Sequence, residues 1–173
     1  FDPDADRLHE ECGVVGVFGC DDAAALTALA LHALQHRGQE ACGIVSFDGE
    51  KFNSERRLGL VGDNFNDEKV IKRLTGRQAM GHNRYSTTGG TTLRNVQPLF
   101  AHLEHGGMAV AHNGNLTNAM TIHDQLIKAG SIYQSTSDTE VILHLMARAR
   151  GTRVVERFIE AIRQLEGAYA LVA

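Results

Sequence analysis

Apolar residues fall into short runs along the chain, and glycine and polar turn residues separate one run from the next. Strand-like spacing predicts strands at residues 12–19, 41–47, 51–58, 98–101, 108–111, 131–135 and 168–172, and another that begins at residue 79. Helical spacing predicts helices at residues 23–36, 67–74, 118–128, 141–150 and 152–165. The sequence shows no repeat and no interdomain linker, which favours one domain that mixes strands and helices.

Local signals refine the ends of several elements. Asp21 and Asp22 can cap the first helix, and Gly106-Gly107 predicts the turn between two neighbouring strands. Ser137 and Glu140 have the spacing of a capping box, in which Ser137 bonds forward and Glu140 reaches back.

The two ends of the sequence differ from its interior. Residues 1–11 show no periodicity, so we expect a leader or arm outside the core. Residues 168–173 stop in the middle of an apolar strand, which predicts a fragment of a longer protein.

Composition excludes several classes of partner. The chain has 173 residues, 43% of them hydrophobic, which is enough to bury a core. A net charge of -4 argues against nucleic acid or an anionic membrane, because both favour a concentrated positive face. The acidic N-terminus is unlike a signal peptide, and no apolar run is long enough to span a membrane. Three cysteines with no zinc or disulfide spacing fit a reducing compartment, so we expect a cytoplasmic protein.

Cys12 is the first candidate for chemistry, because it precedes Gly13 at the entrance to an apolar strand. An ordinary thiol needs a nearby base or cation to attack at neutral pH. Removal of residues 1–11 would give Cys12 a free α-amine, whose pKa of about 7.7 to 8.0 suits it to accept the thiol's proton. The alternative is a half-buried strand cysteine with no chemical role.

Three further positions suggest an amino acid receptor. Asn113 and the N–H of Gly114 can point at one spot, as an oxyanion hole requires, or can simply form a strand-to-helix turn. Arg84 can bind a carboxylate bidentately or form a structural ion pair. Asp138 can hold an ammonium group or only cap a helix. The nine histidines have no metal-ligand spacing, so we predict no metal site.

Five ordered motifs together resemble the glutaminase domain of the class II glutamine amidotransferases. They are Cys12-Gly13-Val14-Val15-Gly16, Leu34-Gln35-His36-Arg37-Gly38-Gln39-Glu40, Gly81-His82-Asn83-Arg84-Tyr85-Ser86-Thr87, His112-Asn113-Gly114-Asn115-Leu116 and Ser137-Asp138-Thr139-Glu140. Within this family, the second and fourth motifs most resemble the members that carry a phosphoribosyltransferase half and serve purine synthesis. Glucosamine-6-phosphate synthase is expected to have tryptophan where this chain has Tyr85.

The resemblance implies an α+β fold of the N-terminal nucleophile hydrolase type, a four-layer αββα sandwich of two antiparallel sheets that is truncated at its C-terminal end. It implies a propeptide at residues 1–11 and an incomplete glutaminase domain at 12–173. The implied reaction is hydrolysis of glutamine through a thioester, with the ammonia passed to phosphoribosyl pyrophosphate to make 5-phosphoribosylamine. The implied site residues are the nucleophile Cys12, the oxyanion-hole residues Asn113 and Gly114, the glutamine-binding residues Arg84, Thr87 and Asp138, and a supporting turn at Arg37 and Gly38.

The resemblance also implies partners outside these residues. The phosphoribosyltransferase domain is absent here, and Mg²⁺ and an iron-sulfur cluster are expected only with that half, so we expect no cofactor in this fragment. The longer protein is expected to form a homo-oligomer. The alternatives are the glutaminase domain of another class II amidotransferase, a non-catalytic glutamine-binding module or unprocessed precursor, and an N-terminal nucleophile peptidase or amidase.

Overall fold

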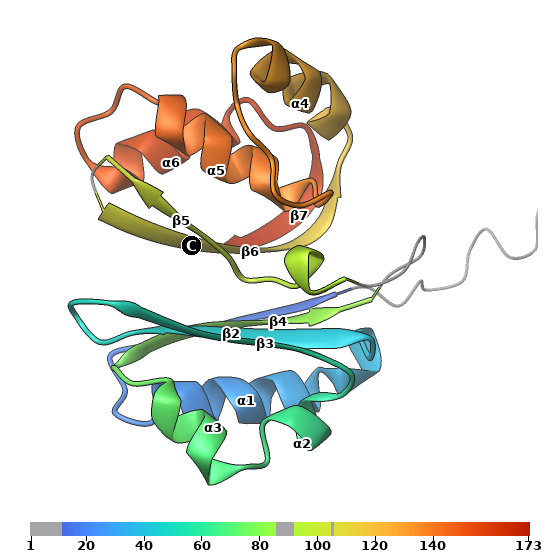
Figure 1. Ribbon diagram of the computed structural model, residues 1–173, viewed down its shortest axis with the longest axis vertical. Helices are drawn as coiled ribbons and strands as arrows, with labels where there is room; N and C mark the ends of the chain where they lie inside the picture. The colour runs from blue at the N-terminus through green and yellow to red at the C-terminus, as the bar shows by residue number, and fades with distance from the viewer. Residues whose placement is uncertain (1–11, 86–91, 105) are drawn as a thin grey trace, which may run out of the picture.

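In the computed structural model, which describes residues 12–85, 92–104 and 106–173, two antiparallel sheets lie face to face between two layers of helices (Figure 1). The strands are β1 (Gly13–Phe18), β2 (Ala41–Phe47), β3 (Phe52–Leu58), β4 (Gln78–Arg84), β5 (Leu99–Leu103), β6 (Gly106–Leu116) and β7 (Gly167–Val172). The helices are α1 (Ala23–Ala33), α2 (Val61–Asn64), α3 (Glu68–Arg73), α4 (Ala119–Lys128), α5 (Thr139–Arg148) and α6 (Val154–Ile162), with short 3-10 helices η1 (Gln35–Arg37) and η2 (Leu93–Asn95). This layering confirms the predicted four-layer α+β sandwich.

The first sheet has the strand order β1-β4-β2-β3, and every neighbouring pair in it is antiparallel. Its register places Gly13 of β1 opposite Asn83 of β4, and Ala41 of β2 opposite Arg84. The start of β1 and the end of β4 therefore meet at one end of the sheet. The second sheet has the order β5-β6-β7, and Figure 1 shows η2 close to the space between the two sheets.

Each sheet has its own apolar core on the side that faces its helices. Leu31 of α1 is fully buried over the first sheet, where Gly81 of β4 allows it to approach closely. A Cβ at Gly81 would lie 2.6 Å from Leu31 Cδ1, so a larger residue there would push α1 away. Ile142 and Met146 of α5 are fully buried over the second sheet. Burial of such side chains contributes about 1.5–3 kcal/mol each.

Several local predictions are wrong. Residues 131–135 form no strand, because their N–H groups turn inward: those of Gln134 and Ser135 donate to the Glu140 carboxylate at 2.8 and 2.7 Å. The Glu140 carboxylate therefore accepts these two N–H groups and not that of Ser137, which donates to Ser135 Oγ, so the predicted capping box does not form. Asp22 occupies the N-cap of α1 without a side-chain cap.

Other elements also differ from the prediction. The helix predicted at 23–36 ends at Ala33 and is followed by η1, and α2 has no counterpart in the prediction. Gly106 and Gly107 pair with β5 inside β6 and do not form the turn itself. The strand predicted at 108–111 continues to Leu116 because its second half pairs with β7.

Candidate active site

Cys12 lies directly before β1, beside the end of β4. The backbone N–H of Tyr85 donates to Cys12 Sγ at 3.3 Å, and Sγ lies 3.6 Å from the Tyr85 carbonyl oxygen. Arg37 Nε donates to the Cys12 carbonyl oxygen at 3.3 Å. Tyr85, just after β4, thus holds the thiol, and Arg37 of η1 holds the backbone of Cys12.

The electrostatics of this position keep the thiol protonated. Burial is the largest effect and raises the pKa of Cys12 above its ordinary value of 9.0. The Tyr85 N–H, the Arg84 charge and the N–H of Cys12 itself oppose that rise in pKa, while the Asp138 charge adds to it. Arg84 and Asp138 thus both lie close enough to Cys12 to affect the pKa of its thiol. Because the thiolate is the nucleophile, this thiol needs a base at neutral pH.

Arg84, the last residue of β4, has a guanidinium that is only partly paired. Its Nη1 donates to the Asn95 carbonyl oxygen at 2.9 Å. Its Nε is buried and has no hydrogen-bond partner among the described residues. A buried donor without a partner costs free energy, so this group is suited to receive a ligand acceptor.

Gly38 lies against the backbone of Arg84. A Cβ at this position would be 2.7 Å from the Arg84 carbonyl carbon, so space and not backbone angle requires glycine. The N–H of Glu40 donates to the Arg84 carbonyl oxygen at 3.2 Å. The predicted supporting turn therefore packs directly on both Cys12 and Arg84.

Asp138 stands at the N-cap position of α5 but makes no side-chain capping bond there. Its Oδ1 lies 3.7 Å from Nδ1 of His112, and its side chain is 34% exposed. Thr139 Oγ1 lies 3.4 Å from the same ring nitrogen. Because the carboxylate is not used to cap the helix, it remains available to a ligand on its exposed side.

Asn113 and Gly114 lie inside β6, so the alternative interpretation of these residues as a strand-to-helix turn is wrong. Gly114 has φ of +129° and pairs with Tyr169 of β7, and a Cβ there would lie 2.2 Å from the Ala168 carbonyl oxygen. Only glycine fits both the backbone angle and the space. Asn113 Oδ1 is buried without a hydrogen-bond partner in the described part of the chain.

The structure thus relates the predicted residues to one another. Cys12 is linked to Arg37 by a hydrogen bond and to Arg84 and Asp138 by charge. His112, which precedes Asn113 in β6, contacts Asp138. Thr87 lies outside the described residues.

Polar residues near Pro98 were missed by the sequence reasoning. Asn95 is buried and bonds to both Arg84 and Thr136. Gln97 is buried, and its Oε1 accepts the N–H of His112 at 2.7 Å. The sequence did contain a signal for them: Asn95 and Gln97 lie just before an apolar strand, and amide side chains that are buried there need hydrogen-bond partners.

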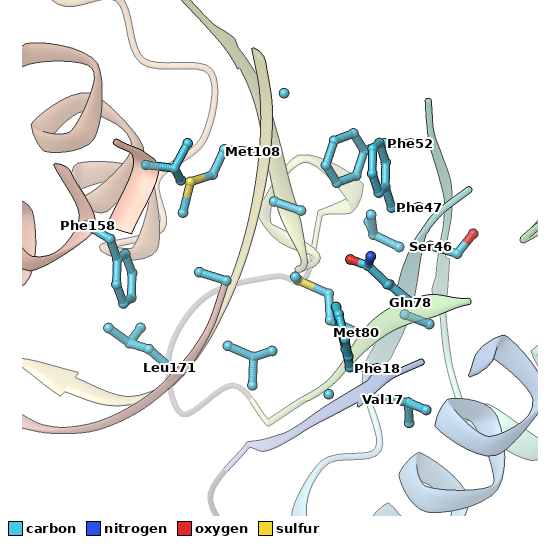
Figure 2. Close-up of a pocket in the computed structure, with 18 of the residues that line it drawn as sticks. Val17, Phe18, Ser46, Phe47, Phe52, Gln78, Met80, Met108, Phe158 and Leu171 are labelled. Atoms are coloured by element: carbon cyan, nitrogen blue, oxygen red, sulfur yellow. The ribbon is translucent and has the colours of Figure 1, made fainter. Parts of the chain in front are cut away.

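A cavity of about 570 Å³ lies between the sheets at the opposite end of β1 and β4 from Cys12. Figure 2 shows Phe18, Met80, Met108, Phe158 and Leu171 around it. Its lining is mainly apolar and includes none of the predicted site residues. Within the described ranges, no three histidine, cysteine or acidic side chains gather where they could hold a metal ion. None of the helices described has the length and apolar character to cross a membrane.

Comparison with known proteins identifies a family. Residues 82–173 match the model of the glutamine amidotransferase domain. The amidophosphoribosyltransferase of Rhizobium etli is 62% identical over 170 residues, which cover 98% of this chain and 34% of that protein. The amidophosphoribosyltransferase of Lacticaseibacillus casei is 46% identical over 95% of this chain and 85% of its own length.

A solved structure agrees with the sequence comparisons. The glutamine phosphoribosylpyrophosphate amidotransferase of B. subtilis, complexed with ADP and GMP, superposes with a TM-score of 0.84 at 41% identity. The match covers 91% of this chain and 34% of that one. The chain therefore spans about a third of the length of the Rhizobium and B. subtilis proteins.

Proposed function

Because this chain belongs to the glutamine amidotransferase domain of the amidophosphoribosyltransferases, we propose that it hydrolyses glutamine to glutamate and ammonia. One observation carries the proposal: Nε of the Arg84 guanidinium is a buried donor without a partner among the described residues, next to a cysteine on which Asp138 also acts. A cation and a carboxylate around one thiol match the two charged ends of a free α-amino acid.

The proposed reaction uses six residues. Arg84 binds the α-carboxylate of glutamine and Asp138 its α-ammonium, with Thr87 assigned to the same pocket. Cys12 Sγ attacks the γ-amide carbon, the carbonyl π-electrons move to oxygen, and Asn113 and Gly114 stabilise that oxyanion. Collapse breaks the C–N bond, and the leaving nitrogen takes a proton and departs as ammonia. Water then cleaves the γ-glutamyl thioester to release glutamate and the thiol.

Removal of residues 1–11 is part of the proposal. The burial that raises the pKa of Cys12 leaves the thiol in need of a base. The backbone nitrogen of Cys12 lies close enough to Sγ to affect that pKa, so a free α-amine there could accept the thiol's proton and return it to the leaving nitrogen.

In the longer protein, we propose that the ammonia reaches a phosphoribosyltransferase domain and reacts with phosphoribosyl pyrophosphate to give 5-phosphoribosylamine. The names of the related proteins support this step. Mg²⁺, an iron-sulfur cluster, homo-oligomer formation and a cytoplasmic location stay predictions.

Intact-mass measurement together with glutamate release tests the proposal. We expect active protein to have lost the mass of residues 1–11, and a diazo-ketone analogue of glutamine to add one label. Cys12→Ala should abolish both label and turnover. Cys20→Ala is the matched control, because Cys20 lies just beyond the far end of β1, and it should retain both. Full activity with all 173 residues retained would contradict the maturation step, and binding of glutamine with neither label nor turnover would favour a non-catalytic binding module.

A further inference from the structure

One asparagine bonds both to Arg84 and to the segment just before Asp138, the two residues assigned to the charged ends of glutamine. Asn95 ends η2 and is 7% exposed. Its carbonyl oxygen accepts Nη1 of Arg84 at 2.9 Å. Its side-chain Nδ2 donates to Thr136 Oγ1 at 2.8 Å, and its Oδ1 accepts the N–H of Thr136 at 3.0 Å. A single residue therefore ties the end of β4 to the segment that precedes α5.

Thr136 lies two residues before Asp138, in a segment that is hydrogen-bonded on both sides of Thr136. The next residue, Ser137, donates its hydroxyl to Thr139 Oγ1 at 3.0 Å and accepts the Thr139 N–H at 3.3 Å. On the other side, the Glu140 carboxylate holds the N–H and hydroxyl of Ser135 at 2.7 and 2.6 Å. Because the segment is bonded on both sides of Thr136, a shift of Thr136 must move the backbone that carries Asp138.

We infer that Asn95 is a positioning residue that sets the separation between Arg84 and Asp138, and so determines selectivity for a ligand with both an α-carboxylate and an α-ammonium group. This rests on the proposed function, because it assigns those two residues to the two ends of glutamine. The bidentate bond to Thr136 matters most, since it fixes both the distance and the direction of the aspartate segment. Asn95 itself does not touch the ligand.

Calorimetry on the Cys12→Ala protein measures this without turnover. The ligands are glutamine and glutaramate, which is glutamine without its α-amino group. We expect Asn95→Ala to weaken the binding of glutamine about tenfold and that of glutaramate by less than about threefold. The reason is that the contact of Asp138 with the ammonium group depends on the correct separation from Arg84. Thr136→Val removes only the hydroxyl and should reduce the same selectivity by a smaller factor.

Asn64→Ala is the matched control. Asn64 also uses its side-chain amide to hold backbone, donating to the Leu58 and Leu60 carbonyl oxygens at 2.8 Å, away from the proposed site. It should leave the selectivity unchanged. Equal weakening of both ligands by Asn95→Ala would indicate a purely structural role and overturn the inference, as would unchanged affinities.

Turnover of the protein with Cys12 intact separates the two proposals. Selective binding of glutamine that depends on Asn95, without hydrolysis, would refute the glutaminase function and support the inference. Hydrolysis of glutamine, with a ligand selectivity that Asn95→Ala leaves unchanged, would support the glutaminase function and refute the inference about Asn95.

Discussion

Arg84→Gln is the most direct perturbation of the proposed site, because it removes the guanidinium and leaves an uncharged amide. The change removes the Nη1 bond to the Asn95 carbonyl oxygen and the Nε donor that has no partner among the described residues. If that donor and a neighbouring N–H bind the substrate carboxylate, the loss costs about 3 to 4 kcal/mol. At about 1.4 kcal/mol per factor of ten, kcat/KM for glutamine should fall roughly 140- to 700-fold.

The assay compares glutamate release with alkylation of Cys12 by iodoacetamide, which has no amino acid group. We expect alkylation to change by less than about fivefold, because burial has a larger effect than Arg84 on the pKa of the thiol. Loss of the Asn95 bond should lower the free energy of unfolding by about 1 kcal/mol in urea titration.

Arg77→Gln is the matched control for Arg84→Gln. Arg77 immediately precedes β4, at the end away from Cys12, and its Nη1 pairs with Asp21 at 3.0 Å. This pair is exposed, so its loss should leave kcat/KM within about twofold. A fall of less than tenfold for Arg84→Gln in folded protein would refute the assignment of Arg84 to the substrate carboxylate.

Three other changes test separate features of the site. Gly114→Ala should destabilise the protein by at least about 2 kcal/mol in urea unfolding and reduce turnover, because a Cβ would lie 2.2 Å from the Ala168 carbonyl oxygen; unaltered stability would contradict the observed backbone. Burial lowers the pKa of His82 to about 3 from 6.5, so the unfolded chain binds the extra proton, and stability should decline as the pH falls from about 6.5 towards 3. His82→Gln should make this decline shallower when unfolding is measured at several pH values, and an identical slope would exclude His82 as its source. Alkylation of Cys12 in the unprocessed chain should still accelerate above pH 9.0, whereas a plateau below that pH would contradict the raised pKa of its thiol.

The strand and helix pattern was largely predictable because burial imposes local periodicity. The strand at Ala41–Phe47 was predicted to the residue, and α3, α4 and β7 within about two residues. The errors lie where distant partners decide the local structure. β6 continues through Asn113 and Gly114 because β7, more than fifty residues later, supplies its hydrogen bonds. Residues 131–135 form no strand because the Glu140 carboxylate accepts the N–H groups of Gln134 and Ser135.

The sequence by itself determined the candidate residues, because a cysteine before a glycine, a lone arginine at the end of a strand and an Asn-Gly pair are uncommon combinations that only a few kinds of chemistry require. Only the tertiary structure decided that Arg84 and Asp138 both act on Cys12. Antiparallel register places Cys12 beside Arg84, and the contact of His112 with Asp138 joins the second sheet to the same group. The tertiary structure also revealed Asn95, whose hydrogen bonds to Arg84 and Thr136 span 11 and 41 residues of sequence. Such contacts leave no local periodic signal, because folding and not sequence spacing brings their partners together.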